Sequence, residues 1–144
     1  MSSHDEIDPS EIIMRRILPS DANTTRIEIV EGKERLTSPT MQPRANEDHL
    51  SFSRAKYTTP EALIELAREY LSPAQMEGVS VWGLTVADVM QIEDGAGGHL
   101  CVRAKPTAED PGHCGVFSSD GKPYPPHLKA VNRKLARAAR KIFP

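Results

Sequence analysis

The chain of 144 residues has few aromatic side chains, few cysteines and no long hydrophobic run. Tyr, Trp and Phe make up 5% of the residues, which leaves little material for stacking against unpaired bases. No stretch approaches the roughly 18 apolar residues that span a bilayer. The first ten residues are polar and acidic, unlike a signal peptide, so we expect a cytoplasmic protein with no membrane partner. Two cysteines are too few for a disulfide scaffold.

Charge is distributed unevenly along the chain. The formal net charge is −2 at pH 7, but residues 128–143 carry six basic side chains and no acidic one, which leaves −8 for the remainder. Segregation of this kind bears on the partners of a protein and not on its fold.

Alternation of apolar and polar residues predicts several strands, and cap signals predict helices between them. A helix is expected over 59–71, because Thr59 offers an N-cap and Pro60 and Glu61 suit the first turn. A shorter helix is expected over 85–92. The predicted strands are 11–18, 26–30, 49–57, 78–84, 99–105 and 113–117.

This order predicts an α+β fold with a mainly antiparallel sheet of about five strands and two main helices packed on one side. Residues 1–10 are predicted to form a disordered tail, and residues 11–144 a single domain. Residues 37–48 contain two prolines and no apolar period, so they are expected to form a long surface loop. Such loops are either functional or plain excursions of the chain.

The C-terminal segment has the strongest helical pattern. Apolar residues three and four apart between Leu128 and Ile142 predict a basic amphipathic helix over 126–142. Its basic face is either a solvated surface or an electropositive site for nucleic acid or an acidic protein. Arg133, Arg137 and Arg140 are the candidate partner-binding residues.

Arginines and serines on the predicted strands form the first candidate ligand site. Arg15 and Arg16 are adjacent on one strand, so one of them should face the interior, where an unpaired guanidinium is unfavourable. Such an arginine meets a carboxylate or holds an anionic ligand, unless it lies on a solvated edge. Ser51, Ser53 and Arg54 on a later strand could contact the same ligand.

His113 is the candidate catalytic residue, because it follows a tight loop at the start of a strand. Cys114 lies beside it, but neighbours on a strand point to opposite faces and rarely form a nucleophilic pair. The same geometry opposes a zinc site built from His99, Cys101, His113 and Cys114. Buried cysteines with a hydrogen-bonded histidine are the alternative. We predict no metal and no cofactor.

Several stretches resemble an uncharacterised group of small bacterial α+β proteins. They are Met14-Arg-Arg-Ile-Leu-Pro19, Leu50-Ser-Phe-Ser53, Thr59-Pro-Glu61, residues 78–86 and residues 102–113. The resemblance implies a bacterial accessory protein and carries no activity with it. In that group a small residue is expected where Cys114 stands.

A more distant likeness is to ADP-ribosyltransferases, in which an arginine on a first strand holds the dinucleotide phosphates and a serine strand shapes the nicotinamide pocket. Arg15 or Arg16 with Ser51 and Ser53 would be the counterparts, although Glu93, Asp94 and Glu109 all fall in turns and none is an obvious catalytic acid. Two functions follow as hypotheses. The first is a small binding or accessory module for a protein or nucleic-acid partner. The alternative is a nucleotide-binding or ADP-ribosyltransferase-like enzyme with an arginine, serine and histidine pocket.

Overall fold

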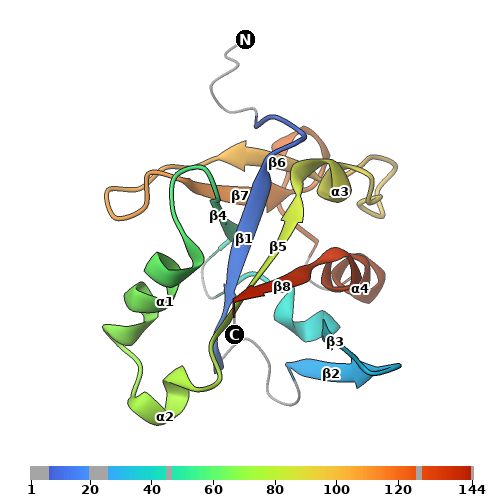
Figure 1. The fold of residues 1–144 in the computed structure, drawn as a ribbon. Coiled ribbons are helices and arrows are strands. Elements are labelled where there is room, and N and C mark those ends of the chain that lie inside the picture. Colours follow the sequence, from blue (N-terminus) through green and yellow to red (C-terminus); the bar gives the residue numbers. More distant parts are fainter. Residues whose placement is uncertain (1–6, 20–25, 45–46, 126–127, 144) are drawn as a thin grey trace.

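The computed structural model describes residues 7–19, 26–44, 47–125 and 128–143. A six-stranded antiparallel sheet dominates it, in the order β6-β7-β4-β1-β5-β8 (Figure 1). Its strands are β1 (Ile12–Ile17), β4 (Leu50–Arg54), β5 (Ser80–Thr85), β6 (Cys101–Ala104), β7 (His113–Phe117) and β8 (Arg140–Phe143). A separate hairpin joins β2 (Ile27–Val30) to β3 (Lys33–Leu36). The helices are α1 (Pro60–Arg68), α2 (Pro73–Met76), α3 (Val86–Met90) and α4 (Lys129–Ala138), with short 3-10 turns η3 (Ser38–Thr40) and η4 (Ser119–Gly121). The predicted α+β class is confirmed.

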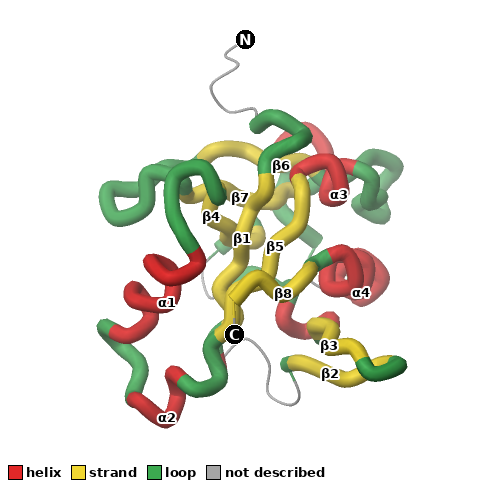
Figure 2. Tube along the Cα trace, in the orientation of Figure 1, coloured by secondary structure: helices red, strands yellow, loops and turns green. Residues whose placement is uncertain are grey.

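The two main helices cover opposite faces of the sheet, and not one side as expected (Figure 2). The cause lies in β1, where Ile13 and Met14 are both buried although they point in opposite directions. Ile13 belongs to the main core, to which α4 contributes Val131 and Leu135. Met14 packs instead with Leu63 of α1 in a second cluster. A central strand that is apolar on both faces needs cover on both.

Helix α1 begins where its sequence signals place it. The Thr59 hydroxyl accepts a hydrogen bond from the Ala62 amide at 3.1 Å, and Pro60 occupies the first turn. The helix ends at Arg68, earlier than expected, and Ser72 then caps the short helix α2 through a capping box. Helix α2 was not predicted, because four residues are too few to show a helical period.

The predicted helix over 126–142 is too long at its C-terminal end. Helix α4 stops at Ala138, because Ala139 has extended backbone angles, and the chain continues as β8 along the free edge of β5. Ile142 therefore lies on a strand and is 43% exposed. Residues 126 and 127 lie outside the described residues. Pairing with a distant strand satisfies the backbone here, which helical periodicity cannot reveal.

The N-terminal segment is more ordered than predicted. Ile7 is buried in the main core, and the Ala87 amide donates to the Pro9 carbonyl at 2.9 Å. The expectation of a disordered tail is therefore wrong for residues 7–10, and residues 1–6 lie outside the described residues. In the part of the chain that the structure describes, no helix is long and apolar enough to cross a bilayer.

Candidate ligand-binding cleft

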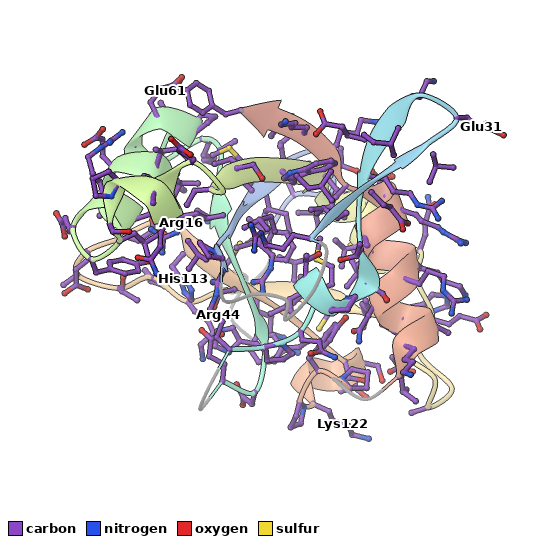
Figure 3. The ribbon with its side chains drawn as sticks, turned by 90° about the horizontal axis from the view of Figure 1, so that it is seen from below. Arg16, Glu31, Arg44, Glu61, His113 and Lys122 are labelled. Carbon is purple, nitrogen blue, oxygen red and sulfur yellow. The ribbon has the colours of Figure 1, made fainter. Side chains whose placement is uncertain are left out.

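A cleft of about 420 Å³ opens on the face of the sheet that α1 borders. Its apolar lining comes from Met14, Phe52, Leu63 and Leu66. Its polar lining includes Arg16, Arg44, Glu47, Ser51, Ser53, Tyr70, Asp110 and His113. Figure 3 shows Arg16, His113 and Arg44 on the same side of the molecule, away from Lys122 and Glu31. Proteins bind small ligands most often in pockets of this size, roughly 300–1,000 Å³.

Four of the six ligand residues predicted from the sequence line this cleft: Arg16, Ser51, Ser53 and His113. Strand pairing brings them together. Ser53 of β4 is paired directly with His113 of β7, so the two side chains share a face. Ser51 lies two residues earlier on the same face, and Arg16 projects from β1.

The other two predicted ligand residues, Arg15 and Arg54, serve the fold. Arg15 is 1% exposed and donates hydrogen bonds to the carbonyls of Thr40, Ser51 and Gln42. Arg54 forms a two-pronged ion pair with Glu11 at 2.8 and 2.9 Å. One of the two adjacent arginines points inward, as predicted, and its guanidinium donates to backbone oxygens.

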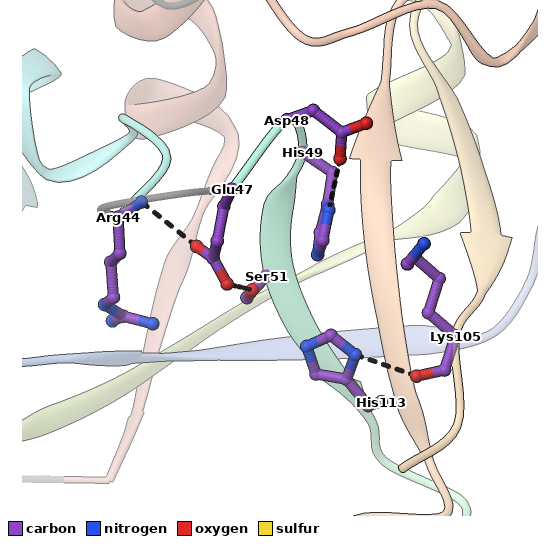
Figure 4. Close-up of polar contacts among 7 residues, drawn as sticks. All are labelled: Arg44, Glu47, Asp48, His49, Ser51, Lys105 and His113. Atoms are coloured by element: carbon purple, nitrogen blue, oxygen red, sulfur yellow. Dashed lines mark hydrogen bonds and ion pairs between the residues drawn. The ribbon is translucent and has the colours of Figure 1, made fainter.

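His113 enters the cleft in one defined tautomer. Its Nδ1 lies 2.9 Å from the Lys105 carbonyl, which can only accept, so Nδ1 carries the proton. In the neutral ring, Nε2 is then a hydrogen-bond acceptor, and it points away from Lys105 toward the side where Ser51 and Glu47 lie (Figure 4). The imidazole can therefore accept a proton from a ligand in the cleft.

Cys114 cannot join His113 in chemistry, because its thiol lies on the opposite face of β7 in the main core. It is fully buried, and burial raises the pKa of the thiol to about 12. The divergence expected for neighbours on a strand is thus observed. Cys101 has a different partner: its thiol donates to the Ser118 carbonyl at 3.2 Å. Within the described residues, no three His, Cys, Asp or Glu side chains are grouped so as to hold a metal ion.

Two carboxylates that the sequence analysis did not single out hold the serines. The Ser51 hydroxyl donates to Glu47, which also accepts from the Arg44 amide at 3.0 Å. Burial raises the pKa of Glu47, but these hydrogen bonds and the nearby charge of Arg44 together lower it by more, so the net pKa lies below its usual value. Glu47 is therefore ionised at neutral pH. Its position at the end of the long loop over 37–48 was the one signal available.

Asp110 shapes the loop that delivers His113. Its carboxylate accepts hydrogen bonds from the Ser53 hydroxyl at 2.6 Å and from the Gly112 amide at 3.1 Å. Its backbone carbonyl accepts a hydrogen bond from the His113 amide at 3.1 Å. Asp110 thus links the start of β7 to β4 and holds the backbone of His113 in position.

Two guanidinium groups border the cleft. Arg16 donates to the Leu63 carbonyl at 3.2 Å and lies 5.7 Å from the centre of the Tyr70 ring. Arg44 donates to the Arg16 carbonyl at 2.7 Å, which holds the loop against β1. Both arginines are anchored by backbone contacts, so their positive charge is fixed in place beside the cleft.

A second histidine, His49, contacts the ring of His113 and was not among the predicted site residues. His49 is buried, with its Nδ1 3.0 Å from Asp48 and its ring stacked on Phe117. Its ring meets that of His113 edge-on, at 5.8 Å between centroids. Gly115 makes this possible, since a Cβ there would lie 2.7 Å from the His49 ring. Among the described residues, His49 Nε2 is the one buried side-chain polar atom without a hydrogen-bond partner.

The candidate partner-binding arginines lie elsewhere. Arg133 and Arg137 are exposed on α4, and Arg140 is exposed on β8. None of the three lines the cleft. The two groups of residues chosen from the sequence therefore belong to two separate surfaces.

Comparisons with known proteins identify no relative of this chain. A scan against protein-family models, a search of curated proteins and a search of solved structures each find no match. The properties of the cleft therefore follow from its own residues.

Proposed function

We propose that the chain binds a nucleotide in the cleft between α1 and the face of β1, β4 and β7. One observation carries the proposal: Arg16, Ser51, Ser53 and His113 come from three strands and meet in one cleft. The cleft combines fixed cations, ionised hydrogen-bond acceptors and an apolar floor. A nucleotide needs all three, because its phosphate is anionic, its ribose hydroxyls are donors and its base is largely apolar on its faces.

Each part of the ligand has a matching part of the cleft. The guanidinium groups of Arg16 and Arg44 suit phosphate oxygens, which arginine binds through paired N–H groups. The Glu47 carboxylate is a strong acceptor for a ribose hydroxyl. Leu66 of α1 and the other apolar residues on this face of the sheet, Met14 and Leu63, offer a surface for the base. Glu47, Glu69, Glu109 and Asp110 also line the cleft and repel a ligand that is anionic along its whole length.

The stronger form of the proposal is turnover of the bound nucleotide. His113 Nε2 faces the cleft as a proton acceptor and would act as a general base on a ligand hydroxyl or on water. Glu47 supplies the carboxylate that was missing from the likeness to ADP-ribosyltransferases. NAD is therefore the second ligand to examine after ADP, with release of nicotinamide as the readout.

Calorimetric titration with ADP and with adenosine tests the proposal. ADP is expected to bind at least about tenfold more tightly than adenosine, since one charge-assisted hydrogen bond contributes about 1.5–3 kcal/mol. Arg16→Met should weaken that preference, because only the guanidinium of Arg44 then remains for the phosphate. Arg68→Met, which changes an exposed arginine of α1 that is paired with Glu65, is the matched control and should bind as the wild type does. Equal affinity for ADP and adenosine, or no heat from either ligand at millimolar concentration, would contradict nucleotide binding.

His113→Ala separates binding from catalysis. If His113 acts as a base, this variant still binds ADP but loses turnover of NAD, and its thermal midpoint is unchanged because the ring is partly exposed. A variant that binds nothing and also melts early would return His113 to a structural role.

A further inference from the structure

A second pocket, small and polar, lies between the β2–β3 hairpin and α4, with a volume of about 150 Å³. Three of its lining residues are arginines, one from β3 and two from α4. The polar residues around it are Glu28, Arg35, Thr37, Ser38, Arg133 and Arg137. It shares no residue with the cleft described above.

The charges in this pocket do not balance. Arg35 is paired with Glu28 at 2.7 Å, which uses the one carboxylate present. Arg133 and Arg137 are one helical turn apart, on the same face of α4. Among the described residues, neither has an ion pair or a hydrogen-bonded side-chain partner. The pocket therefore carries a formal charge of about +2, and like charges held this close favour an anion between them.

We propose that this pocket holds a backbone phosphate of a double-helical nucleic acid. Guanidinium groups and hydroxyls are the groups that most often contact nucleic-acid phosphates, and the pocket provides both. The positive surface also continues beyond the pocket. Lys129, Lys134 and Arg140 are exposed and have no ion pair in the described part of the chain.

A row of cations fits a polyanion better than an isolated phosphate. Helix α4 has 10 residues and is about 15 Å long, which spans several of the charges that duplex DNA carries every ~1.7 Å. No aromatic residue lines the pocket among the residues described, so it offers nothing for unpaired bases to stack on. Binding through the backbone of a duplex, without reading of bases, follows from this composition.

The acidic remainder of the chain does not cancel this surface. At physiological ionic strength the Debye length is about 8 Å, so carboxylates farther away are largely screened. Two nearby carboxylates are already paired, Glu28 with Arg35 at 2.7 Å and Glu34 with Lys141 at 3.2 Å, so each neutralises one cation. We therefore expect weak, salt-dependent affinity, with a Kd of roughly 10⁻⁴–10⁻⁶ M at physiological salt.

Fluorescence anisotropy with a labelled duplex DNA of about 20 base pairs tests the site, at several salt concentrations. The double variant Arg133→Ala/Arg137→Ala should bind more weakly than the wild type. The slope of log K against log salt should become shallower by about 2, since two phosphate contacts are lost. Arg68→Ala/Lys122→Ala changes the net charge equally at exposed positions outside the pocket and should keep the wild-type slope.

Three outcomes would overturn the proposal. The first is no binding of the duplex even at 50 mM salt. The second is an equal loss of affinity in the two double variants, which would mean that net charge alone decides binding. The third is competition by polyglutamate of matched charge as effective as that by unlabelled duplex, which would indicate an acidic protein partner. Arg16→Met should bind the duplex normally, so failure here and failure of nucleotide binding in the cleft are distinguishable.

Discussion

Replacing Arg15 by Met should lower the free energy of unfolding by about 2–4 kcal/mol, whereas the same change at Arg16 should lower it by about 1 kcal/mol. The two arginines are adjacent in sequence and point to opposite faces of β1. Arg15 belongs to the buried face, and Arg16 borders the cleft. The pair therefore tests whether the face of the strand decides if an arginine serves stability or binding.

The magnitude for Arg15 follows from its three hydrogen bonds, to the carbonyls of Thr40 at 3.2 Å, Ser51 at 2.9 Å and Gln42 at 3.0 Å. A hydrogen bond to a charged group contributes about 1.5–3 kcal/mol, so three contribute roughly 4.5–9 kcal/mol. Met avoids the cost of burying a charge, which is several kcal/mol and offsets about half of that sum. The carbonyls of Thr40 and Ser51 then lose a donor in a buried setting, so the balance stays unfavourable.

Urea unfolding of the wild type, Arg15→Met and Arg16→Met measures the difference. In thermal melts, Arg15→Met should lower the midpoint by roughly 6–12 °C for a chain of this size. Equal destabilisation by the two substitutions would refute the assignment of the arginines to separate faces. A neutral or stabilising Arg15→Met would refute the account of the three carbonyl contacts.

Three further predictions concern other parts of the fold. Thr59→Ala removes the cap of α1 and should cost about 1 kcal/mol in urea unfolding, while an unchanged midpoint would mean that the hydrogen bond to the Ala62 amide contributes nothing. Cys114 should resist iodoacetamide at pH 8 in the native protein and react once the chain is unfolded, since burial raises its pKa to about 12; native labelling at the rate of a free cysteine, followed by mass spectrometry, would disprove the burial. Hydrogen bonds from Ser118, Ala96 and Ser119 lower the pKa of Asp94, so its contribution to stability is present above about pH 4 and is lost as pH falls below its unfolded value. Asp94→Asn should therefore be less stable than the wild type at pH 7, with the difference shrinking below pH 4; a difference independent of pH would contradict the ionised role.

Local patterns predicted the elements of this fold better than their arrangement. The strand around Arg15 and the cap at Thr59 follow from alternation and from side-chain chemistry within a few residues. Strand β8 depends on a partner more than 50 residues away, β5, and the same residues also fit a helical period. The placement of α1 and α4 on opposite faces depends on how β1 is buried on both sides, which no local pattern encodes.

The cleft was partly predictable for the same reason. Ser51, Ser53 and His113 were chosen for their chemistry on predicted strands, and antiparallel pairing of β4 with β7 brought them together. Glu47 and His49 were missed because their roles arise only from contacts in space, a hydrogen bond from Ser51 and a ring stacked on Phe117. Residue type alone could not separate Arg15 from Arg16.

The most direct test of the central claim is an NMR titration that follows the histidine ring signals as ADP is added. If the nucleotide occupies the cleft, the signals of His113 shift with a single affinity, and those of His49 follow because its ring touches that of His113 at 5.8 Å between centroids. His99 is exposed and does not line the cleft, so its signals should stay in place. Unchanged His113 signals at saturating ADP, or equal shifts at His113, His49 and His99, would contradict nucleotide binding in the cleft.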